Sequence, residues 1–142
     1  MFLYTTREAL AKLVNASVQL VNALAEKTEI TAVSGATILP GSTLSTKIEI
    51  PVYKNSMAVE VNVTYDESAT AGGNLDIYYS IDGINYDTKT DQGVILPFTA
   101  GSTEQQTFIF PAATNHAEIR IVNNDATYDL TVNSVKVVFL NK

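Results

Sequence analysis

The N-terminal segment of this chain has the pattern of an amphipathic helix whose polar side chains occupy only a narrow part of its surface. The polar residues recur at two heptad positions: Glu8, Asn15 and Asn22 at one, and Lys12, Gln19 and Glu26 at the other. Large aliphatic residues cover most of the remaining circumference: Leu10, Leu13, Val14, Val18, Leu20, Val21 and Leu24. One packing partner covers only one side of a helix, so a face this broad needs several neighbours. We therefore expect these aliphatic residues to form an assembly interface, with copies of the chain or with another protein.

Local signals predict where this helix begins and ends. Thr5 and Glu8 match a capping box, which places the first helical residue near Thr6. From Thr28 onward the chain becomes rich in β-branched residues, and Gly35 is expected to interrupt that run. The sequence predicts a helix for assembly or docking within residues 1–27, roughly 30 Å long, and a β-domain over residues 28–142. The alternative is that the helix packs on that β-domain.

Composition argues against several classes of partner. The 142 residues carry a formal net charge of −6 without a local cluster of Lys or Arg, which disfavours nucleic acid. Cysteine is absent, so neither disulfides nor thiolate metal sites are expected. The helix is too polar to span a membrane and lacks the basic face of an interfacial helix, and its charges argue against a secretory signal. We expect no membrane partner and synthesis in the cytoplasm.

After the helix, apolar and polar residues alternate in about eight strand-like runs separated by turn residues. Strands that follow one another without intervening helices favour antiparallel sheets, and about eight of them favour a jelly-roll-like β-sandwich. The runs at residues 46–53 and 57–63 are predicted to form a hairpin that turns at residues 54–56. Pro51 has no N–H group and fits best at a sheet edge or at a bulge, so the first of these runs is not expected to be central throughout.

The last run, residues 130–140, contains a change of phase. Its apolar residues switch from even to odd positions: Leu130 and Val132, then Val135, Val137 and Phe139. A regular strand cannot turn both sets inward, because a slip of one residue moves every side chain to the other face. We predict a β-bulge or a short break at Asn133 and Ser134.

The dipeptide Asp82-Gly83 predicts a tight hairpin turn, because glycine adopts the positive φ that such turns need. It follows a run that is expected to face inward: Leu75, Ile77, Tyr79 and Ile81. A calcium loop is the alternative interpretation of the oxygen-bearing residues here: Asp82, Asn85, Asp87 and Asp91, with Gly83. Their spacing lacks the glycine and the terminal Glu of an EF-hand, so solvated acids on a turn are favoured and no metal is expected.

Exposed tyrosines raise the question of sugar binding. Tyr78 should point opposite to Tyr79, hence outward beside Asp76, and Tyr86 lies just beyond the turn. Aromatic faces offer broad apolar surfaces with a polar end, suited to stacking on sugar rings. Asp76, Tyr78 and Tyr86 are therefore the candidates for glycan contact. The alternative is that these tyrosines are ordinary strand residues with partly exposed rings.

No catalytic site is predicted. His116 is the only histidine, so a cluster of histidines cannot bind a metal. Any Ser-His-Asp arrangement would have to include His116. The carboxylates form no paired set on a recognised scaffold. We expect a protein that is not an enzyme and needs no cofactor.

Three stretches give the β-region a resemblance to known proteins. Residues 78–86, 107–112 and 118–124, with the sequences YYSIDGINY, TFIFPA and EIRIVNN, resemble β-sandwich modules of bacteriophage virion proteins, such as capsid decoration, head-fibre and tail accessory components. Similar strand and turn sequences occur in discoidin-like sugar-binding domains, although this chain lacks their Trp and Cys. The phage resemblance implies a trimer or larger set attached to a capsid or tail, and it transfers no individual functional residue.

These observations predict a structural protein of a phage particle that is not an enzyme and is located in the virion. It would self-associate, or dock on other virion proteins, through its N-terminal helix. The alternative is a carbohydrate-binding β-sandwich module, with a glycan as its partner.

Overall fold

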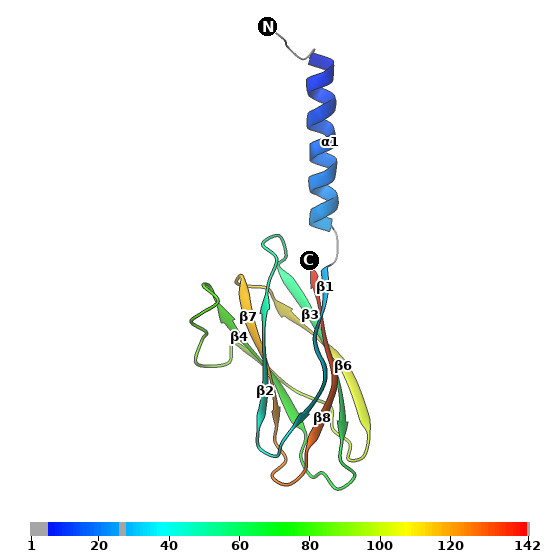
Figure 1. The fold of residues 1–142 in the computed structure, drawn as a ribbon, viewed down its shortest axis with the longest axis vertical. Coiled ribbons are helices and arrows are strands. Elements are labelled where there is room, and N and C mark those ends of the chain that lie inside the picture. Colours follow the sequence, from blue (N-terminus) through cyan, green and yellow to red (C-terminus); the bar gives the residue numbers. More distant parts are fainter. Residues whose placement is uncertain (1–5, 26–27, 142) are drawn as a thin grey trace.

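The computed structural model describes residues 6–25 and 28–141, and within the helix it describes side chains as far as Gln19. These residues form one helix and eight strands: α1 (Thr6–Ala25), β1 (Thr28–Ile38), β2 (Thr43–Glu49), β3 (Ser56–Tyr65), β4 (Gly73–Ser80), β5 (Gln92–Ile95), β6 (Thr103–Pro111), β7 (His116–Asn123) and β8 (Leu130–Leu140). The structure describes α1 from Thr6 onward, and Thr5, the predicted helix cap, lies outside the described residues. Figure 1 shows α1 extending away from a β-sandwich.

The strands form two antiparallel sheets of four strands each. Sheet A has the order β1-β8-β3-β6 and sheet B the order β2-β7-β4-β5. Strands adjacent in the sequence mostly lie in opposite sheets, and the two sheets pack face to face, which is the arrangement of a jelly roll. The predicted fold class, a helix followed by an antiparallel jelly-roll-like sandwich of about eight strands, is confirmed.

The core lies between the two inner faces and follows the alternation of the sequence. Every second residue of β3 is buried, and so is every second residue of β4. The largest fully buried side chains come from both sheets, Phe139, Met57, Leu75, Ile77, Ile119, Ile121 and Leu130 with several valines, and from Leu96, which follows β5. This alternation leaves the other residues of each strand on the outer faces.

The predicted bulge in the last strand is confirmed. Asn62 of β3 pairs with Ser134, and the next residue, Val63, pairs with Val132, so Asn133 is the extra residue. The bulge keeps both phases of the apolar residues facing inward. Gly35 of β1 lies opposite Asn133 and adopts a φ of +78°. The prediction that Gly35 interrupts its run is therefore wrong, because a glycine with positive φ lets β1 continue past the bulge to Ile38.

The predicted hairpin between residues 46–53 and 57–63 is wrong. β2 pairs only with β7, in sheet B, whereas β3 pairs with β6 and β8, in sheet A. Residues 50–55 connect the two sheets, and the Ile50 N–H donates to the Asn115 carbonyl at 2.8 Å. Alternation shows that one face of each run is buried, but not which strand lies beside it. β2 is an edge strand, as expected, and Pro51 lies beyond its end.

Helix α1 keeps its aliphatic side chains in solvent. Four of the seven residues predicted for an assembly interface are more than half exposed: Leu10 at 58%, Leu13 at 64%, Val14 at 52% and Val18 at 53%. The side chains of the other three, Leu20, Val21 and Leu24, lie outside the described ones. Where side chains are described, the sandwich thus does not cover the helix. Among the described residues, no helix is long and apolar enough to cross a membrane.

Candidate functional site

The outer face of sheet B carries acidic, basic, hydroxyl and aromatic side chains. Strand register aligns two rows of outward residues across β2, β7 and β4. One row is Lys47, Glu118 and Tyr78, and the other is Ser45, Arg120 and Asp76. We call these six residues the sheet B face. Three strands that are far apart in the sequence contribute to it, because jelly-roll connections bring them together.

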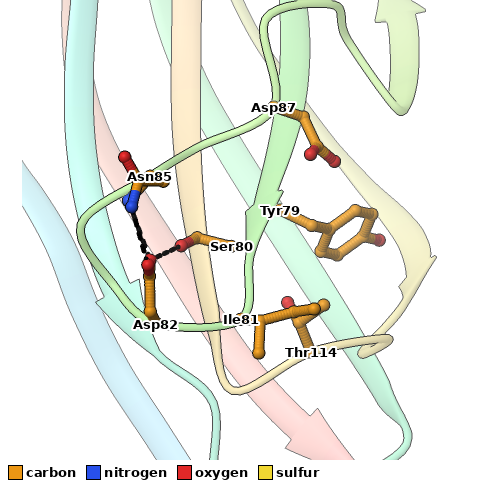
Figure 2. Close-up of a pocket in the computed structure, with 7 residues that line it drawn as sticks. All are labelled: Tyr79, Ser80, Ile81, Asp82, Asn85, Asp87 and Thr114. Carbon is orange, nitrogen blue, oxygen red and sulfur yellow. Dashed lines mark hydrogen bonds between the residues drawn. The ribbon is translucent and has the colours of Figure 1, made fainter.

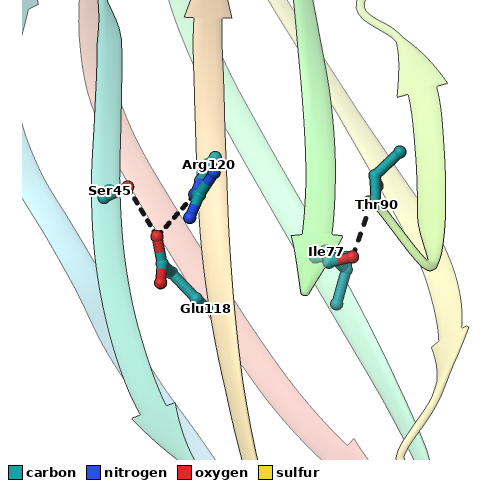
Figure 3. Close-up of polar contacts among 5 residues, drawn as sticks. All are labelled: Ser45, Ile77, Thr90, Glu118 and Arg120. Atoms are coloured by element: carbon teal, nitrogen blue, oxygen red, sulfur yellow. Dashed lines mark hydrogen bonds and ion pairs between the residues drawn. The ribbon is translucent and has the colours of Figure 1, made fainter. Parts of the chain in front are cut away.

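Glu118 holds the centre of this face. It is only 6% exposed although it points outward. Its Oε1 atom accepts hydrogen bonds from Arg120 Nε at 2.5 Å and from Ser45 Oγ at 2.9 Å (Figure 3). The hydrogen bond from Arg120 is the largest cause of a lowered pKa of Glu118, and the same bond raises the pKa of Arg120. The pair therefore stays charged and in fixed geometry.

Each candidate tyrosine has a cation over its ring. The Arg120 guanidinium lies 4.0 Å from the centroid of the Tyr78 ring, and the Lys47 ammonium lies 4.8 Å from that of Tyr86. Such contacts hold aromatic and basic side chains in place. Because each cation covers one face of its ring, a ligand could stack only on the opposite face.

Asp76 supplies a carboxylate beside the Arg120 guanidinium. Partial burial raises the pKa of Asp76, and the positive charge of Arg120 opposes that rise. Across the ladder on β5 lies Gly93, where an added Cβ would come within 2.9 Å of Asp76 Oδ1. A glycine at this position therefore leaves room for the carboxylate at the surface.

The loop at residues 81–91 brings Tyr86 to the sheet B face. Asp82 Oδ1 accepts hydrogen bonds from the backbone N–H groups of Ile84 and Asn85 and from Ser80 Oγ. These hydrogen bonds hold the pKa of Asp82 well below its usual range. Gly83 has a φ of +74°, and an added Cβ would lie 2.9 Å from the His116 ring, so only glycine fits this turn. The turn is locked against β7 by this close packing.

This loop also overturns two predictions. Asp82-Gly83 does form a turn, but not a tight hairpin, because residues 81–91 all lie between β4 and β5. The Asp91 N–H donates to the Ile77 carbonyl and Asp91 Oδ2 accepts from the Tyr79 N–H, so the strands pair only beyond the loop. Ile81 is 82% exposed rather than inward-facing, because it belongs to the loop and not to the strand.

Two hollows flank the loop. One, of about 310 Å³, is lined by residues of the loop, the end of β4 and Thr114 (Figure 2). The other, of about 280 Å³, lies on the side of β2 and is lined by Lys47, Ile48, Glu49, Asp82, Gly83, Tyr86 and His116. The second hollow shares Lys47 with the sheet B face and so continues it toward Tyr86. Within the described ranges, no group of three or more His, Cys, Asp or Glu residues could hold a metal ion.

The structure places the three predicted glycan-contact residues on the same side of sheet B, with Tyr86 across β7 from Asp76 and Tyr78. Asp76 and Tyr78 are partly exposed on β4, and Tyr86 lies over Lys47, which neighbours Glu118 across the ladder. The sequence interpretation missed Lys47, Glu118 and Arg120. Charged residues that alternate with isoleucines at residues 118–121 were the available signal that Glu118 and Arg120 point outward. Nothing in that pattern placed them between Lys47 and Tyr78.

No protein-family model and no curated protein matches the chain. Solved structures match its fold. A protein described as Family 16 Carbohydrate Binding Module-2 aligns with a TM-score of 0.50 and 14% identity, over 72% of this chain and 74% of that one. A CBM4 structure aligns with a TM-score of 0.51 and 14% identity, over 80% and 70% of the two chains.

A phage protein is also similar. The enzymatically active domain of tailspike protein 4 from bacteriophage CBA120 aligns with a TM-score of 0.51 and 9% identity, over 78% of this chain and 19% of that one. At identities this low, the likeness of all three concerns the fold alone. The chain is thus a jelly-roll β-sandwich of the kind that carbohydrate-binding modules also adopt.

Proposed function

We propose that the sandwich binds carbohydrate on the sheet B face. The observation that carries this proposal is that Asp76 and Tyr78 on one side of the fixed Glu118–Arg120 pair, and Tyr86 on the other, share one side of sheet B. A hollow of about 280 Å³ lies beside Lys47 and Tyr86. The similarity in fold to two proteins described as carbohydrate-binding modules supports it.

The chemistry of the sheet B face suits hydroxyl-rich ligands. Asp76 offers an acceptor, and Arg120, whose side chain is 34% exposed, offers donors on the same row. Neighbouring sugar hydroxyls donate and accept at once, so an adjacent carboxylate and guanidinium can bind both. The free side of the Tyr78 ring would pack against the apolar face of the sugar ring. Glu118 would act as a positioning residue, since it orients Arg120.

A glycan array followed by titration calorimetry tests this proposal. We expect the parent protein to bind at least one glycan, and Tyr78→Ala to weaken that binding at least tenfold, which corresponds to about 1.4 kcal/mol. Tyr53→Ala is the matched control, because Tyr53 is 57% exposed on the loop between β2 and β3 and is not part of the sheet B face.

Two outcomes would contradict the proposal. Absence of any glycan signal for the parent protein would end it. Equal binding by the Tyr78→Ala and Tyr53→Ala variants would place the site elsewhere on the sandwich. Circular dichroism of both variants checks that the sandwich is intact.

A second candidate function is attachment of the sandwich to a virus particle through α1. The exposed aliphatic side chains of the helix favour a role in attachment. The resemblance to phage virion modules suggests that the chain attaches to a phage particle. We expect purified particles to contain the parent chain and to lack a Leu13→Asp variant. Particles without the parent chain would contradict this location.

A further inference from the structure

Helix α1 presents an apolar stripe that the described part of the chain leaves in solvent. Leu10, Leu13, Val14 and Val18 are 52–64% exposed, and Figure 1 shows the helix pointing away from both sheets. A continuous apolar surface of this kind marks a site of interaction.

Ser17 lies within this stripe and does not prevent its burial. It occupies the same heptad position as Leu10, one heptad further along the helix. Its hydroxyl donates to the Leu13 carbonyl at 2.9 Å, so its hydrogen bond is made inside the helix. A polar group that is already paired can be removed from water without leaving a donor unsatisfied. The stripe can therefore be buried along its length.

The width of the stripe indicates how many helices must surround it. When Leu10 and Ser17 are placed at heptad position a, Leu13 falls at position d. Val14 then falls at e and Ala9 at g, where a two-stranded coiled coil usually carries charges. Because a, d, e and g are all apolar or small, each helix needs contacts on both sides of its seam. That requirement is met by two or more neighbouring helices.

The area that two helices can bury against each other also favours more than two helices. A helix of this length is roughly 30 Å long and about 10 Å across, so one partner helix covers at most roughly 500 Å² of it. Stable interfaces between two proteins bury about 800 Å² on each partner. A pair of these helices does not reach that area, whereas a bundle in which each helix contacts two others buries more of each one.

We propose that copies of this chain assemble through α1 into a parallel bundle of at least three helices. Copies arranged around one rotation axis all point the same way, so the helices run parallel with Leu10 of each copy in one layer. The inference names a partner for the helix and rests on the exposed stripe itself, not on attachment to a virus particle. It does not depend on the sugar-binding proposal, and absence of the chain from virus particles would leave it standing.

The mass of the full-length chain in solution tests the assembly. We expect the parent to sediment with at least three times its chain mass of 15.3 kDa, and Leu13→Asp to sediment as a monomer. Asn15→Asp is the matched control, because it adds the same charge at a polar heptad position, and it should keep the parent mass. The β-sheet dichroism of all three proteins should be the same.

A parent that is monomeric or dimeric would overturn the proposal, even if α1 then binds another protein or a lipid vesicle. An oligomer that survives Leu13→Asp would also overturn it, because some other surface would then hold the copies together.

Cross-linking tests the parallel orientation. The chain has no cysteine of its own, so Leu10→Cys introduces a single thiol. Mild oxidation should link pairs of chains through this residue, as seen on a denaturing gel. Asn15→Cys, on the polar side, should give no link at matched concentration. An oligomer that forms no link through Leu10→Cys would overturn the parallel arrangement.

Discussion

Helix α1 and strand β3 carry similar aliphatic side chains and hold them in opposite surroundings. Four inward apolar residues of β3 are at most 2% exposed: Met57, Val59, Val61 and Val63. Four large aliphatic residues of α1 are more than half exposed: Leu10, Leu13, Val14 and Val18. β3 lies between β8 and β6 and faces sheet B, whereas α1 has no layer over it in the described structure. Aliphatic content thus shows that a surface needs burial, but the tertiary arrangement decides whether the chain buries it itself.

The strongest test of this comparison is to remove the same kind of side chain from both places. Ile77 is 0% exposed, and Ile77→Ala should cost about 2 to 5 kcal/mol of unfolding free energy through lost burial and a cavity. Leu13→Ala on the helix should leave the unfolding of the sandwich within about 0.5 kcal/mol of the parent. Urea titration followed by circular dichroism measures both. Equal losses would mean that α1 and the sandwich share one core.

A smaller effect is expected where loops close the sandwich at the end away from α1. Asp125 is 2% exposed. Its carboxylate accepts hydrogen bonds from four backbone N–H groups, those of Thr70, Ala71, Thr127 and Tyr128. The bonds from Thr127, Thr70 and Tyr128 are the main causes of its strongly lowered pKa. The stabilisation by Asp125 is therefore complete above the unfolded pKa of about 3.9 and is lost as pH falls toward the folded value.

Asp125→Asn should accordingly lower the unfolding free energy at pH 7 by less than Ile77→Ala does. The gap between this variant and the parent should shrink as the pH falls below about 4, because the unfolded parent then binds a proton at Asp125 while the folded parent does not. Urea titrations at pH 7 and at about pH 3 compare the two. A gap that does not change with pH would show that the charge of Asp125 is unimportant.

The smallest effect is expected on the outer face of sheet A. Asn62 donates to Gln105 Oε1 at 2.9 Å and accepts from Asn133 Nδ2 at 2.8 Å, in contact with solvent. Water replaces such bonds readily, so Asn62→Ala should cost no more than about 1 kcal/mol. Thermal unfolding measures the change. A loss as large as that of Ile77→Ala would mean that this polar ladder, rather than the core, holds β3 in place.

Much of the local structure follows from the sequence because it depends on neighbouring residues. The change of phase between Val132 and Val135 predicts the bulge at Asn133, since no regular strand buries both sets. The alternation through Tyr79 likewise places Tyr78 outward. In contrast, Asp82-Gly83 has the residues of a tight turn, but hydrogen bonds made by Asp82 and Asp91 hold a longer loop there.

The candidate site required long-range pairing. Ser45 and Glu118 are 73 positions apart, and their contact exists because β2 and β7 are neighbours in sheet B. The wrong hairpin between β2 and β3 has the same origin, since alternation reports the buried face and carries no information about the adjacent strand. Without the correct neighbour for β2, Lys47 could not be placed beside Glu118, nor Tyr86 over Lys47.

The sequence alone determined the helix, the strand-rich sandwich, the bulge and the outward direction of Tyr78, because periodicity and glycine chemistry act within a few residues. Only the tertiary structure decided the jelly-roll order of the strands, the Glu118–Arg120 pair at the centre of the sheet B face and the exposure of the α1 stripe. These features depend on which distant segments pack together, and that choice is made by the burial of the whole core at once.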